Sequence, residues 1–194
     1  MNTRDVGTIL RLYPLGEHGA IICWCTAEHG MVRTASRSAL KPGSELAGCI
    51  DLFHECELVY KPSSKSDLYN LVSAELISPR LTLRGHLGRL RLASYMAQLM
   101  LCTVEQGDPD AAWHTLIATA LDYTSTASLR PEILHRFERR LAELHGLYAP
   151  GADSHRALQQ HFSHLPAGRA ELLELLSRAH DEARACNAPP SAAQ

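Results

Sequence analysis

The hydrophobic pattern of this 194-residue chain changes its period once, near Pro79 and Arg80. Before this point, apolar and polar residues alternate in short runs separated by glycine, proline and acidic residues, a pattern typical of β-strands. After it, apolar residues recur every three or four positions, which is typical of helices that bury one face. The sequence therefore predicts an α+β chain with a strand unit in residues 1–80, an all-helical unit in residues 81–186 and a flexible tail in residues 187–194. We expect the two units to have separate cores that meet near Pro79 and Arg80.

Five short strands are predicted in the first unit, over residues 6–12, 20–26, 31–36, 50–60 and 68–77. Glycine-containing turns join the first three strands, which indicates a meander. The fourth predicted strand is the longest, because the alternation of its residues continues from Ile50 to Tyr60. Ile50, Cys56 and Tyr60 fall on one face of this strand, and Asp51 and Glu57 fall on the other. Five antiparallel strands without an intervening helix close most easily into a small barrel, since closure removes unpaired edges.

Helices are predicted over residues 82–102, 111–123, 131–145 and 168–185, with a weaker segment at 154–162. Asp108 or Asp110 can cap the second helix, because a short carboxylate accepts hydrogen bonds from the free amides at a helix start. Pro131 suits a first helical turn, where no amide proton is needed, and Gly146 suits the end of that helix. We expect four or five helices to pack against one another.

The overall composition excludes several classes of protein. A formal net charge of −2 is too low for coating nucleic acid by bulk positive charge, so any nucleic-acid contact must come from local clustering of cations. No apolar run approaches the roughly 20 residues that span a bilayer. The six cysteines show no C-x-x-C spacing, as expected of reduced thiols. We therefore expect a cytoplasmic protein without a membrane segment.

Catalytic and metal-binding motifs are not found in the sequence. It contains no G-x-S-x-G, phosphate-binding glycine loop, H-E-x-x-H or paired-carboxylate motif, so we expect no enzymatic activity. The spacing of His155, His161 and His164 fits no established zinc pattern and includes no cysteine. We therefore expect neither a metal nor another cofactor.

The N-terminal residues resemble a known family. The string GTILRLYPLGE at residues 7–17 and the string TAEHGMVR at residues 26–33 resemble the start of bacterial RecO proteins. The similarity continues through the basic loop SRSALK at residues 36–41 and, more weakly, through FERRL at residues 137–141. Most of residues 4–150 can be placed on the family's pattern.

The resemblance implies an oligonucleotide/oligosaccharide-binding (OB-fold) barrel joined to a helical domain. It implies a recombination and repair mediator that binds single- and double-stranded DNA, anneals complementary strands and helps to load recombinase on single-stranded DNA. The implied partners are RecR and the acidic C-terminal tail of single-strand-binding protein, with a nucleoid-associated location. The four-cysteine zinc module of many members has no counterpart here, because residues 147–155 contain no cysteine pair. The alternative is a protein-interaction adaptor that keeps the scaffold but has lost most DNA affinity.

Candidate nucleic-acid-binding residues lie in and after the third predicted strand. Arg33 and Arg37 are four residues apart and so point to one side of an extended strand, with Lys41 just beyond. Such a track can contact successive phosphates, and this fold type usually binds nucleic acid across its second and third strands. Lys61 and Lys65 form a weaker pair after the fourth strand. The alternative for all five is a solvated face without a partner.

Neighbouring residues limit where DNA is expected to lie. Asp51, Glu55 and Glu57 should repel phosphate, so their face is not expected to be the DNA face. Trp24 could stack on a base or pack in the core, and its neighbour Ile22 favours the core.

A candidate partner-binding surface lies on the helix that begins at Pro131. Arg136, Arg139 and Arg140 stand next to an apolar stripe, a combination that can hold an apolar peptide with a carboxylate end. The alternative is a solvated helix face with ordinary ion pairs to neighbouring glutamates.

Overall fold

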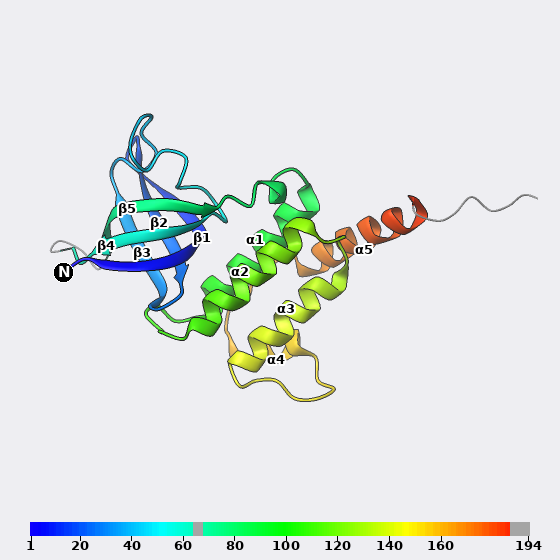
Figure 1. Ribbon diagram of the computed structural model, residues 1–194. Coiled ribbons are helices and arrows are strands. Elements are labelled where there is room, and N and C mark those ends of the chain that lie inside the picture. The colour runs from blue at the N-terminus through cyan, green and yellow to red at the C-terminus, as the bar shows by residue number, and fades with distance from the viewer. Residues whose placement is uncertain (64–67, 187–194) are drawn as a thin grey trace, which may run out of the picture.

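The computed structural model describes residues 1–63 and 68–186, so Lys65 and the predicted tail at 187–194 lie outside the described residues. Figure 1 shows a β-barrel formed by the N-terminal part of the chain and a group of helices beside it. The change in hydrophobic period predicts this division, and the predicted fold class is confirmed. Within the described residues, no helix is long and apolar enough to cross a membrane.

A closed barrel is formed by β1 (Thr3–Leu15), β2 (Gly19–Thr26), β3 (Gly30–Ser36), β4 (Glu55–Lys61) and β5 (Tyr69–Ser78). The strands follow the order β1-β2-β3-β5-β4 around the barrel. The expectation that all pairs are antiparallel is wrong at one point, because β3 and β5 pair in parallel through Thr34 and Ala35. A closed ring of five strands cannot alternate direction all the way round, so one neighbouring pair must run in parallel.

The fourth strand is shorter than predicted. Residues 51–53 form a bend and a turn, and β4 begins only at Glu55. The backbone leaves the extended conformation at Phe53, whose φ of 68° is in the left-handed region. This turn places the Phe53 side chain, which is 1% exposed, in the helical core, whereas Ile50 packs inside the barrel. Packing on two sides therefore overrides the alternating pattern of this segment.

Trp24 is part of the barrel core. Its side chain is 0% exposed, and its Nε1 donates a hydrogen bond of 2.8 Å to Oγ1 of Thr34. Ile9, Ile22 and Leu58 are fully buried in the same cluster. The core interpretation of Trp24 is confirmed, so its indole is not available to stack on a base.

The helical part contains η1 (Leu81–Leu83), α1 (Leu87–Thr103), α2 (Ala111–Thr126), α3 (Pro131–Leu144), α4 (Ser154–His161) and α5 (Arg169–Cys186). The first helix begins later than predicted, because His86 adopts an extended backbone and its side chain caps α1. Asp110 caps α2 and accepts a hydrogen bond of 2.8 Å from the Ala112 amide. Asp108 instead accepts a hydrogen bond of 3.0 Å from Nε1 of Trp113.

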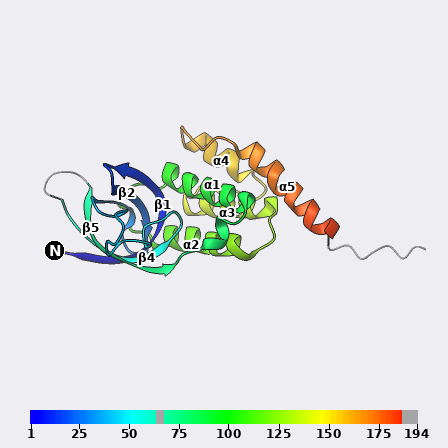
Figure 2. The same ribbon diagram turned by 90° about the horizontal axis from the view of Figure 1, so that it is seen from above.

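The barrel and the helices share a broad apolar contact. Leu10, Cys25, Met31 and Phe53 of the barrel belong to the same buried cluster as the core of the helices. The barrel interior forms a second cluster. The contact is therefore wider than the expected junction at residues 79–80, and the helices lie to one side of the barrel with α5 pointing away from it (Figures 1 and 2).

The turn between β2 and β3 rests against the loop between α1 and α2. Gly30 has a φ of 63°, and a Cβ atom there would lie 1.7 Å from the carbonyl oxygen of Asp108. The amide of Gly107 donates a hydrogen bond of 3.0 Å to the carbonyl of Met31. Only glycine fits this close approach. The tight packing and the hydrogen bond together fix the loop between α1 and α2 relative to β2 and β3.

Candidate nucleic-acid interface

Two arginines flank one cysteine on the outer face of the barrel. Cys23 of β2 pairs with Arg11 of β1 on one side and with Arg33 of β3 on the other. Both arginine side chains are exposed. Burial raises the pKa of the Cys23 thiol, although Arg33 and Arg11 oppose this effect, so the thiol stays neutral. These three residues form a row across three strands, here called the cation row, whose charge comes from its arginines alone.

Arg11 was not predicted as a DNA-binding residue. The pairing of β1 with β2 shifts by one residue between Ile9 and Arg11, which marks a β-bulge. The bulge lets Leu10 face the helical core while the next residue, Arg11, faces solvent. Its guanidinium lies 4.8 Å from the ring centroid of Tyr13. No sequence pattern reveals the neighbouring position of Arg11 and Arg33, because it depends on the register of three strands.

Arg37 and Lys41 lie in the loop after β3 rather than along the strand. β3 ends at Ser36, and residues 37–40 form a turn. The amide of Leu40 donates a hydrogen bond of 2.9 Å to the carbonyl of His18, which holds this loop against the β1–β2 turn. The expectation that Arg37 shares a strand face with Arg33 is therefore wrong in detail. Both loop cations are exposed and extend the positive surface beyond the end of β3.

Lys61 is connected to the same face through β5. It pairs with Asn70, and Asn70 pairs with Ala35 of β3. Ala35 follows Arg33 by two residues and so points to the same side of the strand. The exposed Lys61 thus continues the positive surface around the barrel, while Lys65 lies outside the described residues.

The exposed cations of the barrel face are not neutralised by acids among the described residues. In the part of the chain that the structure describes, no carboxylate forms an ion pair with Arg11, Arg33, Arg37, Lys41 or Lys61. The acids of the β4 side are paired instead. Asp51 pairs with Arg84, and Glu57 pairs with Arg4 at 3.3 Å. Among the described residues, the outer face of β1–β3 and Lys61 at the end of β4 therefore have free positive charge, whereas Asp51 and Glu57 are paired.

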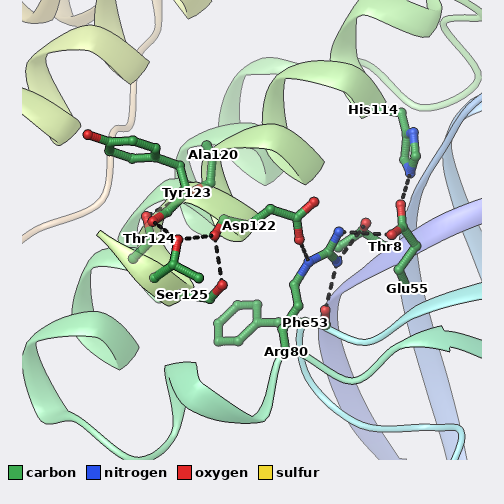
Figure 3. Close-up of polar contacts among 11 residues, drawn as sticks. Thr8, Phe53, Glu55, Arg80, His114, Ala120, Asp122, Tyr123, Thr124 and Ser125 are labelled. Atoms are coloured by element: carbon green, nitrogen blue, oxygen red, sulfur yellow. Dashed lines mark hydrogen bonds and ion pairs between the residues drawn. The ribbon is translucent and has the colours of Figure 1, made fainter. Parts of the chain in front are cut away.

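A buried arginine joins the barrel to the helices. Figure 3 shows the Arg80 side chain, which is 1% exposed, pointing between the two parts. Its guanidinium donates hydrogen bonds to Asp122 of α2 at 2.6 Å and to Glu55 of β4 at 3.0 Å. It also donates to the Phe53 carbonyl at 3.0 Å and to Oγ1 of Thr8 at 3.3 Å. Arg80 thus holds the barrel at a fixed position on α2.

Glu55 receives a second contact from the helical side. Nε2 of His114 lies 3.3 Å from Oε1 of Glu55, and Arg80 contacts the other oxygen. The hydrogen bond with His114 and the charge of Arg80 hold the pKa of Glu55 below its usual range, against the effect of burial. Glu55, whose carboxylate was expected to repel DNA, therefore stabilises the contact between the barrel and the helices.

We predict that Glu55→Gln makes stability less sensitive to acid. Because its pKa is lowered in the folded state, ionised Glu55 stabilises the fold above its unfolded-state pKa of about 4.3. This contribution is lost as the pH falls through the folded-state pKa. Urea denaturation of wild type and variant between about pH 5 and pH 3 measures the difference. Glu45→Gln, at an exposed loop position, is the control, and equal acid slopes for wild type and Glu55→Gln would contradict the prediction.

A second candidate surface is an apolar groove of about 580 Å³ between α2 and α3. Ile133 and Phe137 of α3 and Leu116 of α2 line its apolar part. Arg136 and Arg140 stand along the same groove, as the helical spacing predicts. Arg130, which was not predicted as a partner-binding residue, also lines the groove, and its guanidinium donates a hydrogen bond of 3.0 Å to the Tyr123 hydroxyl.

Arg139 does not line this groove. Its Nε lies 3.0 Å from Oε1 of Glu143, and its guanidinium lies 5.4 Å from the Tyr148 ring centroid. Arg140 contacts the same Glu143 at 2.6 Å, and the two arginines lower the pKa of that carboxyl. The solvated ion-pair interpretation therefore describes Arg139 fully and Arg140 in part, because Arg140 pairs with Glu143 but also lines the groove. Arg136 lines the groove and has no ion pair among the described residues.

His155 contacts a buried carboxylate. Its Nδ1 lies 3.1 Å from Oε1 of Glu138, which also accepts two hydrogen bonds from Arg169 at 2.6 and 2.7 Å. Burial lowers the pKa of His155, so its ring is neutral near pH 7. Among the described residues, no group of three or more His, Cys, Asp or Glu side chains could hold a metal ion.

The closed barrel, its strand order and the helices that follow define an OB-fold protein with a helical second part. Residues 1–80 match the family described as Recombination protein O N terminal. The chain is 30% identical to the DNA repair protein RecO of Anaeromyxobacter sp. (strain K) over 132 residues, which are 68% of this chain and 52% of that protein. It is also 30% identical to the DNA repair protein RecO of Gloeobacter violaceus over 167 residues, which are 84% of this chain and 60% of that protein.

Residues 1–80 therefore belong to the N-terminal domain of the RecO family, as the N-terminal strings indicate, and the similarity to RecO proteins continues into the helical part. The chain spans about half the length of the first relatives it matches, such as the Anaeromyxobacter protein at 52%.

Proposed function

We propose that this chain binds DNA through the outer face of β1–β3 and acts in DNA repair and recombination. The observation that carries the proposal is the cation row, in which Arg11 and Arg33 are exposed on either side of Cys23 without an acidic partner among the described residues. Arg37, Lys41 and Lys61 extend it along the barrel. Cations in such a line can neutralise successive phosphates of a nucleic-acid strand.

The finer role that we propose is that of a mediator. It binds single- and double-stranded DNA, promotes annealing of complementary strands and helps to load recombinase on single-stranded DNA. Membership of a family whose curated members are named DNA repair proteins supports this role. Contacts to phosphates carry no sequence information, as a mediator that acts on many sequences requires. The role needs no catalytic group, so we propose a non-enzymatic protein of the cytoplasm that works at the nucleoid.

We propose that residues 1–80 form the nucleic-acid-binding unit and residues 81–186 the partner-binding unit. On family membership, the partners are a RecR-like protein and the C-terminal tail of single-strand-binding protein. The second candidate function is a protein-interaction adaptor without DNA affinity. The formal net charge of −2 favours it, because it gives little long-range attraction for DNA.

One binding experiment separates the two functions. The purified protein should bind a fluorescent single-stranded oligonucleotide at low salt and lose most of this binding at physiological ionic strength, because screening weakens exposed charges. With iodouracil in the oligonucleotide, ultraviolet crosslinks should map to peptides of β1–β3 and of the loop at residues 37–41. Absence of binding at low salt would favour the adaptor, and crosslinks confined to the helices would move the DNA site.

The α2–α3 groove gives a separate prediction about the partner. A peptide that ends in acidic residues and a phenylalanine should bind there, with the ring in the apolar part and its carboxylates on Arg136 and Arg140. Arg136→Ala and Arg140→Ala should each weaken binding by about 1.5 kcal/mol, or about tenfold, as measured by calorimetry.

Arg139→Ala provides a matched control for the peptide experiment. It removes the same charge from the same helix but at a position outside the groove lining. Peptide affinity should therefore change little in this variant. Equal losses in Arg139→Ala and Arg136→Ala would show that general charge, rather than the groove, holds the peptide.

A further inference from the structure

A narrow groove of about 310 Å³ separates β1 from α1 at the edge of the barrel face. Its walls come from both parts of the molecule and comprise Leu10, Arg11, Leu12, Leu52, Phe53, Ser94, Gln98 and Leu101. This volume is at the lower end of the range for small-ligand sites. It fits one flat ring system better than several side chains of a peptide.

The bulge in β1 creates the barrel side of this groove. Leu10, the extra residue of the bulge, is 3% exposed and packs into the helical core. Arg11 then points outward at the rim, within reach of the groove and of the cation row. The bulge therefore places an apolar floor directly beside an exposed cation.

One face of α1 forms the opposite side. Ser94, Gln98 and Leu101 are spaced by four and three residues, so they lie on the same side of the helix. Within the described part of the chain, neither the Ser94 hydroxyl nor the Gln98 amide makes a hydrogen bond. Both groups can therefore bond to a ligand in the groove.

The lining has the chemistry of a nucleobase site. Its residues are mostly apolar, it contains no carboxylate, and its polar groups are an amide, a hydroxyl and a guanidinium. An amide can pair with a base edge, and a guanidinium plane can stack on a base face. The groove is also continuous with the proposed DNA face, because Arg11 belongs to both.

We propose that this groove receives one unstacked base of a single strand whose phosphates lie on Arg11 and Arg33. The inference rests on the proposed DNA binding and adds a subsite to it. A base held in a duplex is stacked and paired, so entry into the groove favours single-stranded over double-stranded DNA. Gln98 and Ser94 contact the base edge, and Leu101 covers its face.

The test compares a ten-nucleotide thymidine oligonucleotide with an abasic strand of the same length, which keeps the phosphates but has no bases. Wild type should bind the thymidine strand about tenfold more tightly at low salt, because one stacked and bonded base contributes an effect of this size. Ser94→Phe, which fills the groove, should reduce this ratio to about two. Gln98→Leu, which keeps the size of the side chain, should reduce it in part.

The abasic strand also serves as the folding control. Its affinity should be the same in wild type and in both variants, since the phosphate contacts remain. Gln159→Leu, at an exposed position of α4, should leave the ratio at the wild-type value. Equal binding of both strands by wild type, or an unchanged ratio in Ser94→Phe, would overturn the subsite while leaving the DNA-binding function intact. Binding of neither strand by wild type would refute the proposed function and the subsite together.

Discussion

Replacing Arg80 with alanine is expected to destabilise the protein by about 3–5 kcal/mol, the range for removing one partner of a buried ion pair. The guanidinium is 1% exposed and joins Glu55, Asp122 and the Phe53 carbonyl. Its loss leaves the Glu55 carboxylate, which is 15% exposed, with His114 as its remaining partner. A loss of this size is a large fraction of the stability of a typical domain, which is about 5–15 kcal/mol.

Urea denaturation followed by circular dichroism measures this effect. Arg84→Ala is the matched control, because Arg84 pairs with Asp51 across the same junction but is 39% exposed. An exposed pair of this kind contributes about 0–1 kcal/mol, so the control should be nearly as stable as wild type. A loss below about 1 kcal/mol in Arg80→Ala would contradict the role of Arg80 as the link between barrel and helices.

The backbone of Arg80 allows a second comparison. Its φ of 44° lies in the left-handed region, which is unfavourable for residues with a Cβ atom. Arg80→Gly removes the same contacts as Arg80→Ala but also removes this strain. Glycine at this position should therefore be the less destabilising of the two, by about 1 kcal/mol.

Hydrophobic periodicity predicted the type of each element because periodicity is a local property of the chain. The helical spacing also places Arg136 and Arg140 along one groove, and it identifies Asp110 as one of two possible caps. Trp24 could be assigned to the core from its apolar neighbours alone. In each case the relevant partners lie within a few residues of one another in the sequence.

Features that depend on distant segments were not predictable. The fourth strand begins late because Phe53 packs on helices that follow it in the chain. Arg11 and Arg33 lie in one row because both pair with Cys23 of β2, and a bulge in β1 sets the register of its pairing with β2. Arg80 marked a change of pattern in the sequence, but its bond to Asp122 spans 42 residues. These residues form the candidate site and its support, so the site was predicted less completely than the fold.

We propose that the barrel face binds DNA by contacts to phosphates. Arg33→Ala, Arg37→Ala and Lys41→Ala together remove three exposed cations from it. Each phosphate neutralised on a single strand contributes about 0.7 to the slope of log affinity against log salt concentration. The triple variant should therefore lower this slope by about 2, with a large loss of affinity at low salt.

A control with the same change in net charge separates local contacts from overall attraction. Arg156→Ala, Arg178→Ala and Arg184→Ala together remove three exposed arginines from α4 and α5, away from the barrel face. This variant should keep the wild-type slope and lose only a little affinity. It therefore measures how much of any loss comes from net charge.

The most direct test is a salt titration of fluorescent single-stranded oligonucleotide binding by wild type, the barrel triple variant and the helical triple variant. We expect the slope to fall by about 2 in the folded barrel variant and to stay unchanged in the helical variant. A folded barrel variant that keeps the wild-type slope would contradict phosphate binding by Arg33, Arg37 and Lys41.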